Sequence, residues 1–138
     1  MLKQNGVKSA VVFANVLPFT KEIKNALEPE LKKAGIDIKL STDYPPDIKD
    51  MTSILTQAKQ ANPDAVLALA YPGDSVLYSK QAKELGLNSP FQFIAIGPSD
   101  AFYPKAVGPT STEGDVTITH WSPRPEWKGQ QAFYDASW

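Results

Sequence analysis

Short apolar runs along the chain alternate with longer segments in which apolar residues recur at helical spacing. Two of the runs, Ala65–Tyr71 and Phe91–Ile96, are almost wholly apolar, which is typical of strands buried on both faces of a parallel sheet. Val7–Ala14 has the same character, whereas Ile36–Thr42 alternates apolar and polar positions, as a half-covered or edge strand does. Gly114–Trp121 also alternates, so we predict a fifth strand there, at the sheet edge or leading to a hinge.

Two amphipathic helices are predicted between the first three strands. The first covers Thr20–Ala34 and is closed by Gly35, and Pro29 interrupts it on the side expected to face solvent. Asp50 can cap the second, which Asn62–Pro63 ends.

A third helix follows the strand Ala65–Tyr71, with Asp74 expected as its N-cap and Gly86 as its left-handed exit. The order of elements predicts an α/β fold: a doubly wound, mainly parallel five-stranded sheet with helices on both faces. The carboxyl ends of parallel strands meet at one edge. We therefore expect Pro72–Gly73–Asp74 and Gly97–Pro98–Ser99–Asp100 at the edge where open α/β folds bind small molecules.

The length of 138 residues favours one domain with a real core. We expect an N-terminal extension at residues 1–6, an α/β lobe at residues 7–122, and a linker with a truncated helix at residues 123–138. The final helix carries aromatic side chains, Phe133, Tyr134 and Trp138, that lack a surface to bury against. This ending indicates a piece of a larger protein; the alternative is a tail that folds back on its own sheet.

Charge and composition exclude several classes of function. With 14 basic and 15 acidic residues, the formal net charge is −1, which leaves no field to hold a phosphate backbone, so no nucleic acid is expected as a partner. No apolar run reaches the roughly 20 residues of a spanning helix, and the Met1–Gly6 start lacks the apolar core of a signal peptide. Cysteine is absent and His120 is the only histidine, so we expect no metal site, and a hinge hydrogen bond for His120.

Motifs for catalysis and cofactor binding are absent as well. The chain has no G-x-G-x-x-G after the first strand, no P-loop, and no G-x-S-x-G elbow. The corner after that strand, Asn15–Val16–Leu17–Pro18, is uncharged and lacks the acidic pair that holds Mg²⁺ in a phosphoacceptor site. We therefore expect no cofactor and no enzymatic activity.

Long ordered blocks of the chain resemble a known family. The blocks NPDAVLALAYPGDSVLYSKQAKELGL and EGDVTITHWSP lie within a likeness over roughly Val7 to Pro123. They are similar to the second lobe of the extracellular ligand-binding receptors of branched-chain amino acid ABC transporters, the type I periplasmic binding proteins. In that family two α/β lobes, joined by crossing strands, close on a ligand held between the carboxyl edges of their sheets.

The resemblance implies that this chain is the second lobe of a solute-binding protein, with its ligand-binding part at residues 7–122. Its partners would then be a small-molecule ligand, a first lobe of the same protein, and the membrane subunits of an ABC importer. The full-length protein would be periplasmic or extracellular. Two alternatives stay open: an effector-sensing domain of a transcription regulator, which shares this fold, and a flavodoxin-like enzyme or receiver domain.

The resemblance also implies candidate ligand contacts. The family's aromatic residue after the first strand falls on Phe19, and its tyrosine after the third strand falls on Tyr71. The carboxylate that neutralises a ligand's ammonium group falls near Ser99, a hydroxyl, with Asp100 next to it. Because a buried ammonium without a counter-charge costs several kcal/mol, an aromatic or aliphatic carboxylate is favoured over an ordinary branched-chain amino acid.

The other candidate contacts are Pro72, Asp74 and Trp121. For Asp74 the alternative is a helix cap, although free amides at that helix start could face an anionic ligand. Trp121 is expected to pack either on the ligand or on the first lobe. For Phe19 and Tyr71 the alternative is that they only cover the sheet edge.

Overall fold

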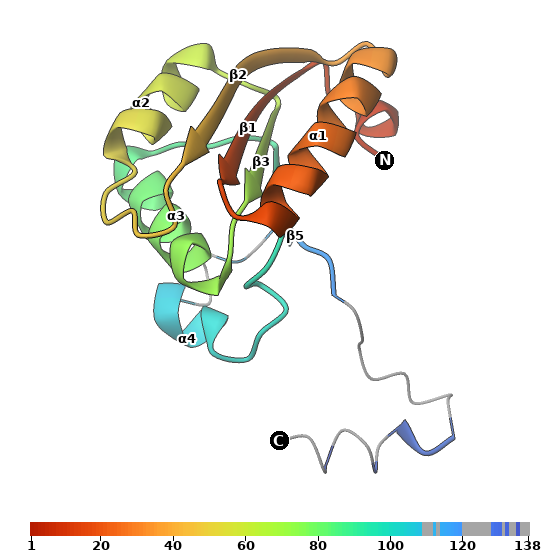
Figure 1. Cartoon of the computed structure of the whole chain (residues 1–138), viewed down its shortest axis with the longest axis vertical. Helices are drawn as coiled ribbons and strands as arrows, with labels where there is room; N and C mark the ends of the chain where they lie inside the picture. The colour runs from red at the N-terminus through yellow and green to blue at the C-terminus, as the bar shows by residue number, and fades with distance from the viewer. Residues whose placement is uncertain (109–111, 113, 120–127, 131, 133–134, 136–138) are drawn as a thin grey trace.

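The computed structural model describes residues 1–108, 112, 114–119, 128–130, 132 and 135 of the chain. Its strands form one parallel sheet in the order β2-β1-β3-β4-β5, with helices on both faces (Figure 1), which confirms the predicted doubly wound α/β fold. The strands are β1 Ser9–Asn15, β2 Asp37–Tyr44, β3 Ala65–Leu69, β4 Phe91–Ile94 and β5 Asp115–Val116. The helices are η1 Lys3–Asn5, α1 Pro18–Lys33, α2 Thr52–Ala61, α3 Pro72–Leu85 and α4 Tyr103–Val107.

The sheet separates two apolar layers. Every residue of β1 and β3 is buried, because these central strands have helices on both sides. Leu31 of α1 packs in one layer, whereas Leu55 of α2 and Tyr78 of α3 pack in the other. β2 alternates exposed and half-buried positions up to its last residue, as predicted for a half-covered strand.

The direction in which the chain winds across the sheet reverses between β1 and β3, and we call this point the strand reversal. From β1 the chain passes through α1 to β2 on one side, and from β2 it returns through α2 to β3 on the other. The carboxyl ends of β1 and β3 lie side by side, but the connections that follow them go to opposite faces of the sheet (Figure 1). In open α/β sheets this reversal is where ligands bind.

Two predicted helix N-caps are wrong, because in each helix a residue close to the predicted one is the N-cap. Asp74 is the third residue of α3, not its N-cap, which is Tyr71, because Pro72 supplies the preset backbone angle of a first helical position. The N-cap of α2 is Met51, although the Asp50 carboxylate accepts the Thr52 N–H at 2.9 Å. In both cases the acidic residue still accepts a backbone N–H at the helix start.

Other helix ends agree more closely with the sequence. α1 starts two residues before the predicted Thr20, with Pro18 in its first turn. Pro29 lies on the exposed side of α1, as predicted. The exits also occur where glycine was expected, with φ values of 76° at Gly35 and 64° at Gly86, in the left-handed region that favours glycine.

The last part of the sheet differs most from the prediction. Within the described residues 114–119 of the expected fifth strand, only Asp115–Val116 form a strand. Between β4 and β5 the chain also contains α4, which the sequence pattern did not predict. Tyr103, at the start of α4, is completely buried, so this turn of helix belongs to the core. His120, Trp121 and residues 123–127 of the expected linker lie outside the described residues.

Among the described helices, none is both long and apolar enough to cross a bilayer.

Candidate functional site

The carboxyl ends of β1 and β3 place two short segments next to each other. Asn15 ends β1 and is followed by the first turn of α1, which contains Phe19; Tyr71 precedes the first turn of α3. Because β1 and β3 are paired in parallel up to Ala14 and Leu69, both segments emerge at the strand reversal. This is the edge that the sequence predicted as a ligand site.

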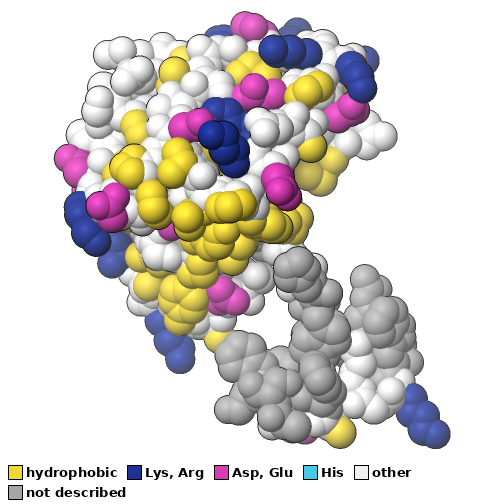
Figure 2. Space-filling view, viewed as in Figure 1, with side chains coloured by type: hydrophobic (Ala, Val, Ile, Leu, Met, Phe, Trp, Pro, Cys, Tyr) yellow, Lys and Arg dark blue, Asp and Glu magenta, His cyan; other side chains and the backbone are white. Residues whose placement is uncertain are grey.

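Phe19 and Tyr71 contact each other across this edge. Their ring centroids are 6.3 Å apart and the ring planes are inclined by 63°, an edge-to-face arrangement that aromatic pairs prefer. Phe19 is 36% exposed and its neighbour Val16 is 41% exposed. Figure 2 shows hydrophobic side chains gathered along the lower edge of the rounded body, where α1 begins in Figure 1. Phe19 is therefore accessible at this edge, with the half-buried Tyr71 against it.

Behind this pair, the Asp74 carboxylate joins three strand ends. Its Oδ2 atom accepts hydrogen bonds from Asn15 Nδ2 at 3.0 Å, from the Tyr44 hydroxyl at 2.7 Å, and from the Tyr71 N–H at 3.3 Å. Burial of Tyr44, together with its hydrogen bond to Asp74, raises the pKa of the phenol far above its usual range. The phenol therefore keeps its proton and donates a hydrogen bond to the carboxylate.

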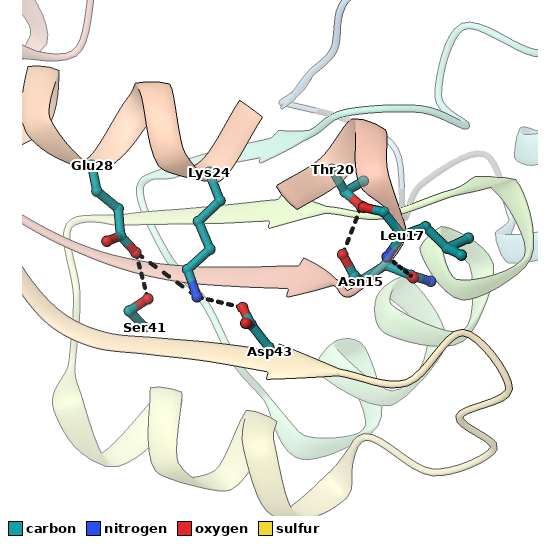
Figure 3. A network of polar contacts seen from close by, with 7 residues as sticks. All are labelled: Asn15, Leu17, Thr20, Lys24, Glu28, Ser41 and Asp43. Atoms are coloured by element: carbon teal, nitrogen blue, oxygen red, sulfur yellow. Dashed lines mark hydrogen bonds and ion pairs between the residues drawn. The ribbon is translucent and has the colours of Figure 1, made fainter. Parts of the chain in front are cut away.

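The corner between β1 and α1 is held by its own hydrogen bonds, which Figure 3 shows. The Leu17 N–H donates to Asn15 Oδ1 at 3.1 Å, and the Thr20 hydroxyl donates to the Asn15 carbonyl at 2.6 Å. Farther along α1, Lys24 pairs with Asp43 of β2. These contacts fix the first turn of α1 against the sheet.

The turn after β4 lies one strand farther along the same edge. The Ser75 hydroxyl donates to the Ile96 carbonyl, which joins the first turn of α3 to this turn. A Cβ atom at Gly97 would lie 3.0 Å from Ser75 Cβ and 3.1 Å from the Tyr103 ring, and the φ of 132° is strained for any side chain, so this turn favours glycine. Beyond Gly97, Ser99 is exposed and Asp100 is half-buried.

The structure thus brings four predicted site residues together at the strand reversal: Phe19, Tyr71, Pro72 and Asp74. Ser99 and Asp100 share the edge but follow the next strand, and Trp121 lies outside the described residues. Sequence reasoning missed Asn15 and Tyr44, although each is a polar residue that ends a strand. A polar residue at the carboxyl end of a predicted strand was the signal that could have identified them.

A shallow hollow of about 320 Å³ adjoins the site on the side of α3. It combines apolar side chains with one carboxylate and one ammonium group, and its lining residues are Pro46, Ile48, Lys49, Gly73, Asp74 and Leu77. The hollow widens the accessible surface beside Asp74.

A second carboxylate, that of Asp115, lies at the far side of the sheet on β5. Burial raises the pKa of Asp115 to about 6, because a carboxylate loses solvation there. Its Oδ2 atom is buried without a hydrogen-bond partner among the described residues. Its strand neighbour Gln92 accepts a hydrogen bond from the Tyr78 hydroxyl at 2.8 Å. Asp115 is thus a titratable group within the fold rather than at the candidate site.

The chain has the fold of an α/β lobe whose strand order reverses at one edge, the place where open α/β folds bind small molecules. The family model of the periplasmic binding proteins matches residues 1–137, and the chain belongs to this family. This confirms the resemblance to the type I periplasmic binding proteins. The family is one of solute-binding receptors.

Curated relatives agree with this assignment. Leu/Ile/Val-binding protein homolog 7 of Brucella abortus (strain 2308) is 35% identical over 100 residues, which is 72% of this chain and 25% of the relative. Homolog 8 of the same strain is 33% identical over 79 residues, 57% of this chain and 19% of the relative. The chain spans about a quarter of the length of homolog 7.

Solved structures share the fold. A leucine-binding protein, LivK, of Thermotoga maritima superposes with a TM-score of 0.85 at 23% identity, over 99% of this chain and 39% of that one. A solute-binding protein of an ABC transporter from Rhodopseudomonas palustris BisB5, solved with 3,4-dihydroxybenzoic acid, gives 0.61 at 22% identity, over 72% of this chain and 27% of that one. At these identities the likeness concerns the fold alone.

Proposed function

We propose that this chain is the second lobe of a solute-binding protein that serves an ABC importer, and that it holds one side of a small organic solute. The observation that carries the proposal is the accessible Phe19–Tyr71 pair at the strand reversal. The rings provide an apolar wall, and the Tyr71 hydroxyl can orient a polar group of the solute. A first lobe of the same protein closes over the solute and excludes water.

The solute class follows from the polar groups at the edge. Ser99 stands where the family resemblance places the carboxylate that neutralises an ammonium group. A solute without that ammonium, such as an aromatic or aliphatic carboxylate, therefore suits this lobe better than an ordinary amino acid. The names of the curated relatives favour the amino acid instead. The aromatic acid in the Rhodopseudomonas palustris structure serves only as a test compound, because that likeness concerns the fold alone.

The same proposal assigns the remaining contacts and the location. Pro72, Asp74, Asp100 and Trp121 flank the solute, the membrane subunits of the importer receive it, and neither a nucleic acid nor a catalytic step takes part. The full-length protein works in the periplasm or outside the cell.

A chain that supplies only one lobe leaves the bound solute exposed to water. The isolated chain should therefore lose several kcal/mol of binding free energy relative to the two-lobe protein.

Isothermal titration calorimetry tests this function. The full-length, two-lobe protein and the isolated chain are titrated with leucine, isoleucine, valine and 3,4-dihydroxybenzoate. We expect saturable binding by the two-lobe protein to at least one compound, and no submicromolar binding by the isolated chain. Tight, saturable binding by the chain alone would contradict the half-site. A preference for leucine over the aromatic acid would contradict the solute class and leave the half-site intact.

A further inference from the structure

One oxygen atom connects the starts of both helices that carry the aromatic pair. Asp74 Oδ2 accepts the N–H of Tyr71, which is the N-cap of α3, and the amide of Asn15, which ends β1. The third donor, the Tyr44 hydroxyl, comes from the end of β2. A single carboxylate oxygen thus joins the carboxyl ends of three neighbouring strands.

The donors themselves have little freedom to move. The exposed fraction is 1% for Asn15 and 2% for Tyr44. Asn15 uses both ends of its amide, since Nδ2 donates to Asp74 and Oδ1 accepts the Leu17 N–H. Because an amide nitrogen can only donate and its oxygen can only accept, these two bonds require the same orientation of the side chain. The amide therefore transmits the position of Asp74 to Leu17.

Leu17 is the N-cap of α1, and Phe19 is the second residue of that helix. We propose that Asp74 is the positioning residue of the solute site: through Asn15 and the Tyr71 N–H it sets the ring of Phe19 against the ring of Tyr71. This inference deepens the proposed function, on which its relevance to a solute rests. The arrangement of the rings is a property of the chain without solute, so it can be tested separately.

The chain contains a matched control at the opposite edge of the sheet. Asp64 Oδ2 also accepts three hydrogen bonds, from the Lys8 N–H at 2.9 Å, the Ser9 N–H at 2.9 Å and the Ser9 hydroxyl at 3.1 Å. Asp64 precedes β3 and Ser9 begins β1, so this carboxylate joins the same two strands at their amino ends. Substitution of Asp64 removes a similar set of hydrogen bonds, but far from the rings of Phe19 and Tyr71.

The experiment compares Asp74→Ala, Asp74→Asn and Asp64→Ala by NMR, with the nuclear Overhauser effects between the ring protons of Phe19 and Tyr71 as the readout. We expect Asp74→Ala to weaken or abolish these cross-peaks in a chain that stays folded. Asp74→Asn should restore them, since the amide oxygen can replace Oδ2 as the acceptor. Asp64→Ala should leave them unchanged. Intact cross-peaks in Asp74→Ala, or an equal loss in Asp64→Ala, would overturn the proposal.

A further variant covers the case in which Asp74→Ala does not fold. Asn15→Ala removes both amide hydrogen bonds, to Asp74 and from the Leu17 N–H, but keeps the Tyr44 and Tyr71 donors on Asp74. We expect this variant to lose the ring cross-peaks as well, and their retention would overturn the proposal. No solute is present in these spectra, so a failure of the proposed function would show in calorimetry and leave this result unaffected.

Discussion

The ring of Phe19 lies edge-on against the ring of Tyr71, with centroids 6.3 Å apart. Phe19 belongs to the helix that leaves β1, and Tyr71 to the turn that leaves β3. The two helices cover opposite faces of the sheet. The ring pair therefore joins the two faces at the strand reversal between β1 and β3. A small molecule placed there meets side chains from both halves of the winding.

Replacing Phe19 with alanine separates binding from stability. Because the ring is 36% exposed in this chain, its loss should lower the unfolding free energy by only about 1 kcal/mol. In the proposed two-lobe protein the solute and the first lobe would bury the same ring. The dissociation constant should therefore rise about 10- to 100-fold, or roughly 1.4 to 2.7 kcal/mol. Calorimetry and urea unfolding measure the two effects, and unchanged affinity would remove Phe19 from the site.

Tyr44→Phe should destabilise the chain by about 1 to 2 kcal/mol, because the variant removes a buried donor to Asp74. A double-mutant cycle with Asp74→Ala isolates this bond. In the Asp74→Ala background the Tyr44→Phe substitution should cost clearly less, as measured by urea unfolding. Equal costs in the two backgrounds would mean that the hydroxyl and the carboxylate do not interact.

Gly97→Ala should lower the unfolding free energy by about 2 to 4 kcal/mol. The new methyl group would lie 3.0 Å from Ser75 Cβ, and the φ of 132° is unfavourable for any residue with a side chain. Gly73→Ala is the control, because its methyl group meets nothing within 4 Å and the position is helical. That substitution should change stability by less than about 0.5 kcal/mol or raise it.

Asp115 should make the stability of the chain depend on pH. Its pKa is raised from 3.8 to about 6 by burial, so between these values the folded chain binds more protons than the unfolded one. The unfolding free energy therefore decreases as the pH rises through this window. Because the carboxyl group is only half-buried, solvent screening limits the effect to about 1 kcal/mol.

The variant Asp115→Asn removes this titration. It should be more stable than the parent chain above about pH 7, where the parent carries a desolvated carboxylate, and should lose that advantage below about pH 4. Thermal or urea unfolding across this range provides the measurement. A stability difference that does not change with pH would show that Asp115 titrates normally in the fold.

Much of the fold follows from local sequence pattern. The apolar runs predicted β1 and β3 because burial on both faces leaves few polar positions, and glycine at the left-handed exits marked the ends of α1 and α3. The start of α3 was harder to place. An aspartate two residues after a proline fits an N-cap as well as a third helical position. The structure distinguishes the two by the extended backbone of Tyr71 and by its N–H bond to Asp74.

The features that sequence pattern missed depend on contacts between distant segments. α4 is five residues long, too short for a helical repeat to be visible. Asn15 and Tyr44 reach Asp74 only because the parallel register aligns the ends of β1 and β2. The family resemblance located Phe19 and Tyr71 at the edge, but the polar contacts that hold them required the three-dimensional arrangement.

Hydrogen–deuterium exchange on the full-length protein, with and without a solute found by calorimetry, shows which edge of this lobe holds the solute. We expect bound solute to slow exchange most in the segments after β1 and β3, residues 15–20 and 71–75. Little change is expected at the opposite edge around Asp64. Protection concentrated at that opposite edge, or absent from both segments, would contradict a solute held at the carboxyl edge of this lobe.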